Sequence, residues 1–133
     1  MLEKLLSLCL IVIGIIHLIP LSGFLGTAQL EPMYDISVSS PELEILMRHR
    51  AVLFGLLGGL FIYAAFRPLY QPLAFVMSAG TLLPFFFLLS QSASYNDAIE
   101  RIAAGDALAL ACLIVAGICY VLKQKPGLIR TAQ

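Results

Sequence analysis

Charged residues are scarce in this chain. Only 12% of its 133 residues are Asp, Glu, Lys or Arg, and 60% are hydrophobic, whereas soluble domains carry about 25% charged residues. Long apolar stretches in so short a chain would leave almost no polar surface to meet water. This composition excludes a soluble domain and predicts an integral membrane protein.

The chain also lacks the motifs of most metal, redox and nucleotide sites. Cys9, Cys112 and Cys119 lie in apolar segments without Cys-x-x-Cys spacing, so we interpret them as small packing residues. His17 lies deep in its segment and His49 at a helix end, a pair that does not suit the two sides of one haem iron. The sequence has no phosphate-cradling glycine motif and no basic surface of nucleic-acid size. We therefore expect no cofactor, no metal and no nucleic-acid partner.

Four apolar stretches, separated by shorter polar segments, predict four helices. Each reaches about 20 residues, the length that crosses a bilayer. Pro68 ends the second helix, and Pro84 inside the third is tolerated in a membrane where neighbours satisfy the freed carbonyl. We predict a single all-α domain over residues 1–133. It is a four-transmembrane-helix bundle with helices at about residues 5–25, 41–66, 73–90 and 98–122.

The sequence predicts a long external loop between the first two membrane spans. About two dozen residues, 26–49, separate the two spans, and long loops tend to be functional. Residues 27–34 fit a short interfacial turn. Ser40 followed by Pro41 is a favourable helix start, with serine at the cap and proline at the first helical position. The second helix is therefore expected to begin outside the bilayer.

Lys and Arg residues are divided unequally between the two ends of the predicted bundle. Four spans put both termini on one side of the membrane. The basic residues on the side of the termini are Lys4, Arg67, Lys123, Lys125 and Arg130. Those on the other side are Arg48, Arg50 and Arg101. The side with more Lys and Arg is cytoplasmic in most membrane proteins. We expect the first helix to be retained, because its apolar run is longer than that of a signal peptide. Both termini are therefore predicted to be cytoplasmic.

Two ionisable residues lie within apolar segments. Asp106 is the single charged residue of the stretch 102–122, and His17 lies in the first apolar run. A charged group that faces hydrocarbon costs about 2.5–3.5 kcal/mol or more, so such residues usually face a protein interior or a wet cavity. The depths of Asp106 and His17 along their helices would allow them to meet. In a purely structural interpretation, Asp106 cross-links helices and His17 bonds a nearby carbonyl, such as one freed by Pro20.

In the functional interpretation, Asp106 and His17 form the floor of an outward-facing pocket. The rim would carry four candidate ligand-binding residues, Arg48, His49, Arg50 and Arg101. Arg48 can instead pair with Glu44, and Arg101 with Asp97, both at the favourable i, i+4 spacing. Arg50 has no such partner. Three consecutive basic residues, 48–50, on the side where positive charge is disfavoured indicate attraction to a lipid headgroup, a carboxylate ligand or Asp106. The alternative for these arginines is a role as interfacial anchors.

Small residues recur at four-residue intervals in two of the predicted helices. Such stripes allow helix backbones to approach closely. They predict contacts within one bundle or, alternatively, the interface of a homodimer. The two stripes are Ala51, Gly55 and Gly59, and Ala103, Ala107 and Ala111.

Several segments resemble a family of small bacterial membrane proteins. They are Arg48-His49-Arg50-Ala51-Val52-Leu53-Phe54-Gly55, continuing to Tyr63-Ala64-Ala65-Phe66-Arg67-Pro68, with His17-x-x-Pro20 and Tyr95-Asn96. The similarity covers nearly the whole chain, and the family resembles the DoxX-like group of four-helix proteins in layout. It implies a location in the bacterial cytoplasmic (inner) membrane. Some members are labelled phosphopantetheine adenylyltransferase. The soluble enzyme of that name has a His-x-Gly-His motif on an α/β fold, a motif that this chain lacks, so no catalytic residues carry over.

Two functional hypotheses follow from the sequence. In the first, the protein is not an enzyme and binds a membrane lipid or small amphiphile, or supports a membrane complex, through the outward-facing pocket. In the second, it is a membrane-embedded enzyme that acts on a hydrophobic substrate, with Asp106 or His17 as general acid or base. A transporter is a third hypothesis, although four short helices leave little room for alternating access.

Overall fold

The protein is a bundle of helices in a computed structural model that describes residues 1–124. The elements are α1 (Leu2–Leu18), the 3-10 helix η1 (Ile19–Leu25), α2 (Thr27–Tyr34), α3 (Pro41–Phe66), the 3-10 helix η2 (Pro68–Tyr70), α4 (Gln71–Gln91) and α5 (Asp97–Gln124). No strand occurs within the described residues. Four helical segments are long and apolar enough to cross a membrane, namely Leu2–Leu25, Pro41–Phe66, Pro68–Gln91 and Asp97–Gln124. The predicted all-α class is confirmed, as are four helices long and apolar enough to cross a membrane.

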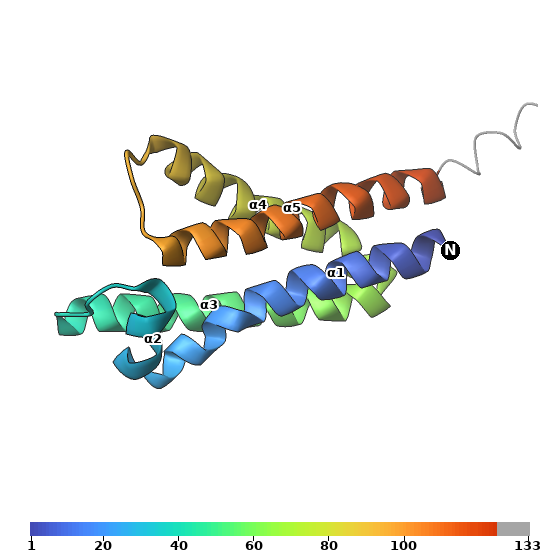
Figure 1. The fold of residues 1–133 in the computed structure, drawn as a ribbon. Helices are drawn as coiled ribbons and strands as arrows, with labels where there is room; N and C mark the ends of the chain where they lie inside the picture. Colours follow the sequence, from blue (N-terminus) through green and yellow to red (C-terminus); the bar gives the residue numbers. More distant parts are fainter. Residues whose placement is uncertain (125–133) are drawn as a thin grey trace, which may run out of the picture.

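Helix α1 lies at the centre of the bundle. It packs along both α3 and α5, while α4 crosses behind α5 (Figure 1). The N-terminus and the end of α5 lie at the same end of the bundle, where Lys123 Nζ contacts Glu3 Oε1 at 2.8 Å. Two of the basic residues counted for the cytoplasmic side, Lys125 and Arg130, lie outside the described residues.

The core is built around one face of α1. Leu6, Leu10 and Ile13 are completely buried, and their spacing of four and three residues places them on one side of the helix. The backbones of α1 and α3 approach closely at Gly14 and Gly58, where a Cβ atom added to Gly58 would lie 2.7 Å from Gly14 O. The two helices can therefore pack this closely only with glycine at that crossing.

The two small-residue stripes behave differently in the structure. On α3, Ala51 is buried and a Cβ atom added to Gly55 would lie 2.6 Å from Leu21 Cδ1, so this stripe makes contacts within the bundle. Gly59 has no neighbouring atom within 4 Å of such a Cβ position. On α5, by contrast, Ala107 and Ala111 are exposed, and the predicted packing within the bundle is wrong there. The core side of α5 is a different face that includes Ala98, Ala109 and Ala116.

The predicted long external loop is not confirmed. Eight of its residues form α2, because Leu30 and Tyr34, four residues apart, bury their side chains and give this short helix an apolar side. Gly26 permits the turn into α2 with φ 130° and ψ −170°, a conformation that is essentially restricted to glycine. The predicted start of the second helix is confirmed, since α3 begins at Pro41 and Ser40 Oγ accepts a hydrogen bond from Leu43 N at 3.2 Å.

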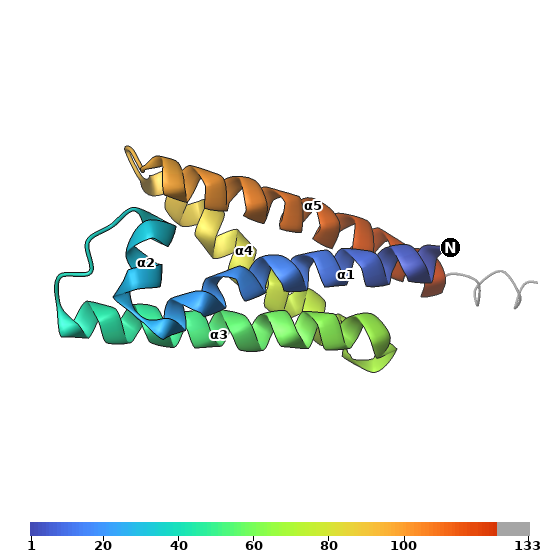
Figure 2. The same cartoon turned by 60° about the horizontal axis from the view of Figure 1, so that its bottom comes forward.

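Proline redirects the chain at the end of α1. Pro20 has no N–H to donate to Ile16 O, and Ile19 N donates to that carbonyl instead. The helix therefore tightens into η1, which turns away from the line of α1 (Figure 2). At this end of the bundle, farthest from the N-terminus, α2 packs on η1 and approaches the start of α5.

Candidate functional site

A cavity of about 270 Å³ lies at the end of the bundle where η1 turns away from α1. Its walls come from α1, η1, α2, α3 and α5. Its lining includes four of the residues that the sequence singles out, His17, Arg50, Arg101 and Asp106, together with Tyr34. Most of the remaining lining is apolar and includes Ile16, Ile19, Met33, Phe54 and Ile102. The cavity thus joins a few charged groups to an apolar wall, which is the usual composition of a small-molecule site.

Arg50 is held in place by two aromatic side chains. Its Nη1 donates a hydrogen bond to Tyr34 Oη at 2.7 Å. The guanidinium carbon lies 5.3 Å from the centre of the Tyr34 ring and 4.7 Å from the centre of the Phe54 ring. Both distances are within the range of cation–π attraction. Arg50 is therefore a half-buried cation with a fixed position in the cavity wall.

The ring of His17 is satisfied by the protein itself. Nδ1 donates to Ile13 O at 2.9 Å, and Nε2 lies 3.0 Å from Thr81 Oγ1. The ring stacks on Phe54 and meets Phe61 edge to face, with the centres of the rings 5.5 and 4.9 Å apart. His17 is 1% exposed. Because both nitrogens have protein partners, His17 has the contacts of a structural residue that closes the inner wall of the cavity.

Asp106 lies in the same cavity but is not paired with His17. Among residues 1–124, Asp106 has no hydrogen-bond partner, and the two ion pairs found there join other residues. Arg50 lines the same cavity as Asp106. His17 bonds a nearby carbonyl, Ile13 O, as the structural interpretation predicts. The carbonyl that Pro20 leaves free, Ile16 O, accepts from Ile19 N instead. Asp106 is therefore a half-buried carboxylate that faces the cavity without a hydrogen bond from the described protein.

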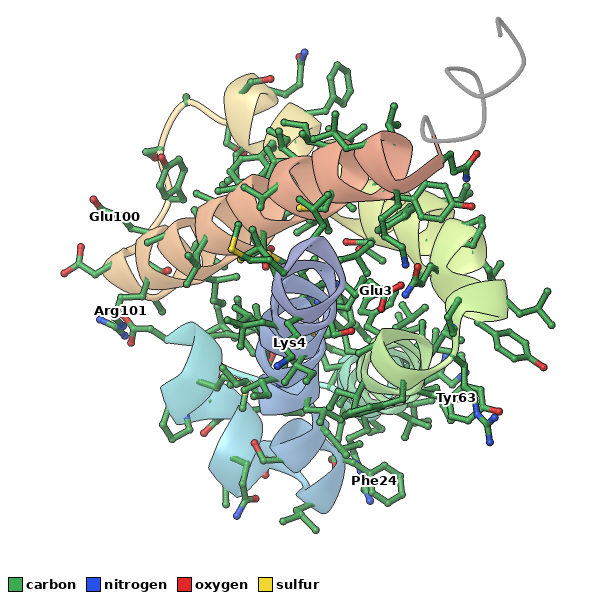
Figure 3. All side chains as sticks on the ribbon, turned by 90° about the vertical axis from the view of Figure 1, so that its right-hand side faces the viewer. Glu3, Lys4, Phe24, Tyr63, Glu100 and Arg101 are labelled. Carbon is green, nitrogen blue, oxygen red and sulfur yellow. The ribbon has the colours of Figure 1, made fainter. Side chains whose placement is uncertain are left out.

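Arg101 marks the mouth of the cavity. It is exposed and extends from the start of α5 toward α2, whereas the neighbouring Glu100 points away from the bundle (Figure 3). The predicted pair of Arg101 with Asp97 is absent from the part of the chain that the structure describes. The other exposed residue of the lining is Ile19, at 61%. The opening is therefore bordered by one cation and one apolar side chain.

Two of the six predicted ligand-binding residues lie elsewhere. Arg48 pairs with Glu44 at 3.1 Å, as the i, i+4 spacing predicts, and its Nε donates to Phe24 O at 2.9 Å. His49 is exposed. Neither residue lines the cavity, because on a helix the side chains at positions 48 and 49 point about 200° and 100° away from that of position 50.

Three residues that shape the site are absent from the predicted set. Tyr34 binds Arg50, and Thr81 binds His17. Asn96 joins the end of α2 to the start of α5. Its Nδ2 donates to Tyr34 O at 2.9 Å and to Asp35 O at 3.0 Å. Its Oδ1 accepts from Ile99 N at 2.9 Å. An asparagine just before a helix is a recognisable N-cap signal. Nothing in the sequence indicates that the same side chain also holds the end of α2.

A smaller cavity of about 190 Å³ adjoins the same arginine. It shares Tyr34, Arg50 and Ile102 with the larger cavity and is otherwise lined by apolar residues such as Met47 and Phe85. Within the first 124 residues there is no group of three or more His, Cys, Asp or Glu side chains that could hold a metal ion. Arg50 and Tyr34 are therefore the polar centre of this end of the bundle.

No family model, curated protein or solved structure matches the chain. The resemblance to DoxX-like proteins accordingly stays a prediction from the sequence, and the assignment of a function rests on the cavity.

Proposed function

We propose that this chain is a non-enzymatic integral protein of the bacterial cytoplasmic membrane that binds a membrane lipid or a small amphiphile in the cavity at Arg50. In this proposal both termini are cytoplasmic and the cavity opens on the outer side. The same outward-facing cavity is the surface through which the protein would otherwise support a membrane complex.

The observation that carries the proposal is the combination of charge and apolar surface in one cavity. Arg50 and Arg101 supply two positive charges and Asp106 supplies one negative charge, while the wall between them is mainly apolar. The mouth repeats this combination, with exposed Ile19 on one element and exposed Arg101 on another. A molecule with a charged end and a hydrocarbon end matches both features.

The proposed orientation rests on the distribution of basic residues. Lys4, Arg67 and Lys123 belong to the end of the bundle opposite the cavity, and Lys125 and Arg130 follow them in the sequence beyond the described residues. The described residues give three basic residues at each end, and the two that follow α5 in the sequence raise the count to five against three, which favours a cytoplasmic location for the termini.

Lipid content after purification tests the proposal. The full chain is purified in a mild detergent and its bound molecules are identified by native mass spectrometry. Wild-type protein should retain a lipid-sized mass, and Arg50→Ala should lose it, because the half-buried cation is then missing. Arg48→Ala is the matched control, since Arg48 lies on the same helix but outside the cavity. Equal lipid content in wild type and Arg50→Ala would refute the proposal.

One observation favours an enzyme as a second candidate. Asp106 faces the cavity without a hydrogen-bond partner among the described residues, as a general acid or base would. His17 is a weaker candidate for that role because both of its ring nitrogens are occupied. The enzyme hypothesis predicts that Asp106→Asn changes the lipid and quinone profile of the cells in the same way as deletion of the protein. A profile like that of wild type would exclude an essential catalytic role for Asp106.

A further inference from the structure

We infer that the ligand is a phospholipid whose headgroup carries a primary amine, with its phosphate on Arg50 and Arg101 and its ammonium group on Asp106. The inference rests on the proposed function and specifies the lipid. Phosphatidylethanolamine has this chemistry.

The phosphate position follows from the unused donors of Arg50. A guanidinium has five N–H donors, and the one hydrogen bond found for Arg50 among residues 1–124 goes to Tyr34. The rings of Tyr34 and Phe54 fix the guanidinium group, so the remaining donors are presented to the cavity at little further cost in conformational entropy. Phosphate oxygens accept such donors in pairs. Exposed Arg101 at the mouth adds a second cation to the same region.

The ammonium position follows from Asp106. A ligand with only a phosphate would satisfy the arginines but would bring a second negative charge close to this carboxylate. A ligand that also carries an ammonium group supplies a positive charge and up to three N–H donors to Asp106. The charges of Arg50, Arg101 and Asp106 therefore match a zwitterionic headgroup better than an anionic one.

The size of the cavity agrees with a headgroup rather than a complete lipid. A volume of about 270 Å³ corresponds to about nine water molecules. The phosphate and ethanolamine groups together contain a similar number of non-hydrogen atoms. The acyl chains would then leave past Ile19, the exposed apolar residue of the mouth.

The charged residues of the cavity lie within about 6 Å of the outer boundary of the hydrocarbon core, where a lipid headgroup can reach them. Helix α3 has 26 residues and is about 39 Å long, about 9 Å more than the hydrocarbon core. We place the cytoplasmic end of α3 at the inner boundary of the hydrocarbon core. Arg50 comes nine residues after Pro41 and then lies about 5 Å below the outer boundary of that core. The same calculation for α5, with 28 residues, places Asp106 about 2 Å below that boundary and Arg101 about 6 Å above it.

Competition among three lipids tests the inference. The full chain is reconstituted into vesicles with equal amounts of phosphatidylethanolamine, phosphatidylcholine and phosphatidylglycerol, extracted gently, and examined by native mass spectrometry. We expect about tenfold more bound phosphatidylethanolamine than either other lipid, the ratio that corresponds to about 1.4 kcal/mol. Phosphatidylcholine is the sharpest comparison, because it keeps both charges of the headgroup but has no N–H to donate. Phosphatidylglycerol keeps the phosphate and has no cation.

Two variants separate the roles of the charged groups. Asp106→Asn, which keeps the shape of the side chain, should bind the three lipids about equally. Arg50→Ala should lose all three, and Arg48→Ala should behave like wild type. Retention of the tenfold preference by Asp106→Asn, or equal binding of the three lipids by wild type, would overturn the inference and leave the proposed function standing. If wild type retained none of the three lipids, the inference would fail, and the proposed function would be left with a small amphiphile as the ligand.

The source of the phosphate and amine groups is tested in the same preparation. Excess soluble glycerophosphoethanolamine is added to wild-type protein loaded with phosphatidylethanolamine. The lipid should stay bound, because its acyl chains contribute apolar contacts that the soluble compound lacks. Complete displacement would assign the cavity to a water-soluble amine phosphate and overturn the lipid assignment.

Discussion

Replacing Asn96 should loosen the wall of the cavity, although Asn96 itself is not one of the residues that line it. Asn96→Ala removes the N-cap of α5, which contributes about 1 kcal/mol. It also removes the partly buried hydrogen bond to Tyr34 O, which contributes about 1 kcal/mol. The bond to Asp35 O is exposed, so water replaces it at little cost. We expect the free energy of unfolding to fall by about 2 kcal/mol.

The predicted effect is local as well as global. Without the bonds from Asn96, α2 is no longer tied to the start of α5, and Tyr34 is held less firmly beside Arg50. Hydrogen exchange measured by mass spectrometry should therefore become faster over α2 than over α1. Asn96→Ser is the control, because serine keeps the N-cap but cannot reach both carbonyls. It should cost about 1 kcal/mol, from the lost bond to Tyr34 O.

Unfolding in detergent, followed by circular dichroism, gives the magnitudes for the three proteins. If Asn96→Ala were as stable as wild type, with unchanged exchange over α2, Asn96 would neither cap α5 nor hold α2. If the serine variant lost as much stability as the alanine variant, the N-cap would contribute nothing separate from the bond to Tyr34 O.

Two further predictions concern the packing of α1. Gly58→Ala should lower the free energy of unfolding by about 1–3 kcal/mol, because the new methyl group would lie 2.7 Å from Gly14 O. Gly59→Ala is the control, because no atom lies within 4 Å of its Cβ position. It should have the stability of wild type or be more stable by up to about 1 kcal/mol. Equal losses of stability in the two variants would contradict the close crossing of α1 and α3 at Gly58. His17→Leu should cost about 1–3 kcal/mol in the same unfolding assay, because two hydrogen bonds of a buried ring are lost; an unchanged stability would show that these bonds contribute nothing.

The sequence predicted the membrane spans well because their signals are local. The start of α3 at Pro41 depends on Ser40 as the cap and on the fixed φ of proline. The pair of Arg48 with Glu44 depends only on helical spacing. The apolar length of each span is likewise a property of consecutive residues. Such features need no knowledge of neighbouring helices.

Predictions that needed a partner from another element were less successful. Arg101 has an acidic residue at i, i+4 spacing but lines the cavity without pairing with it. His17 binds Thr81, which is 64 positions away in the chain. The stripe at Ala107 and Ala111 has the spacing of a packing face but is exposed. In each case the local pattern allowed two or more faces or partners, and the packing of other helices selected one.

The sequence alone determined that this chain is helical, that it carries four apolar spans, and that Asp106 and His17 require shelter from lipid. Those conclusions follow from hydrophobicity and helical periodicity, which act along a single segment. Tertiary structure decided that Arg50 contacts Tyr34, that His17 is fully bonded within the protein, and that Asp106 is left facing a cavity. The physical reason is that hydrogen bonds and cavities depend on the rotation and close approach of separate helices, and these are fixed only when the side chains of all the helices pack together.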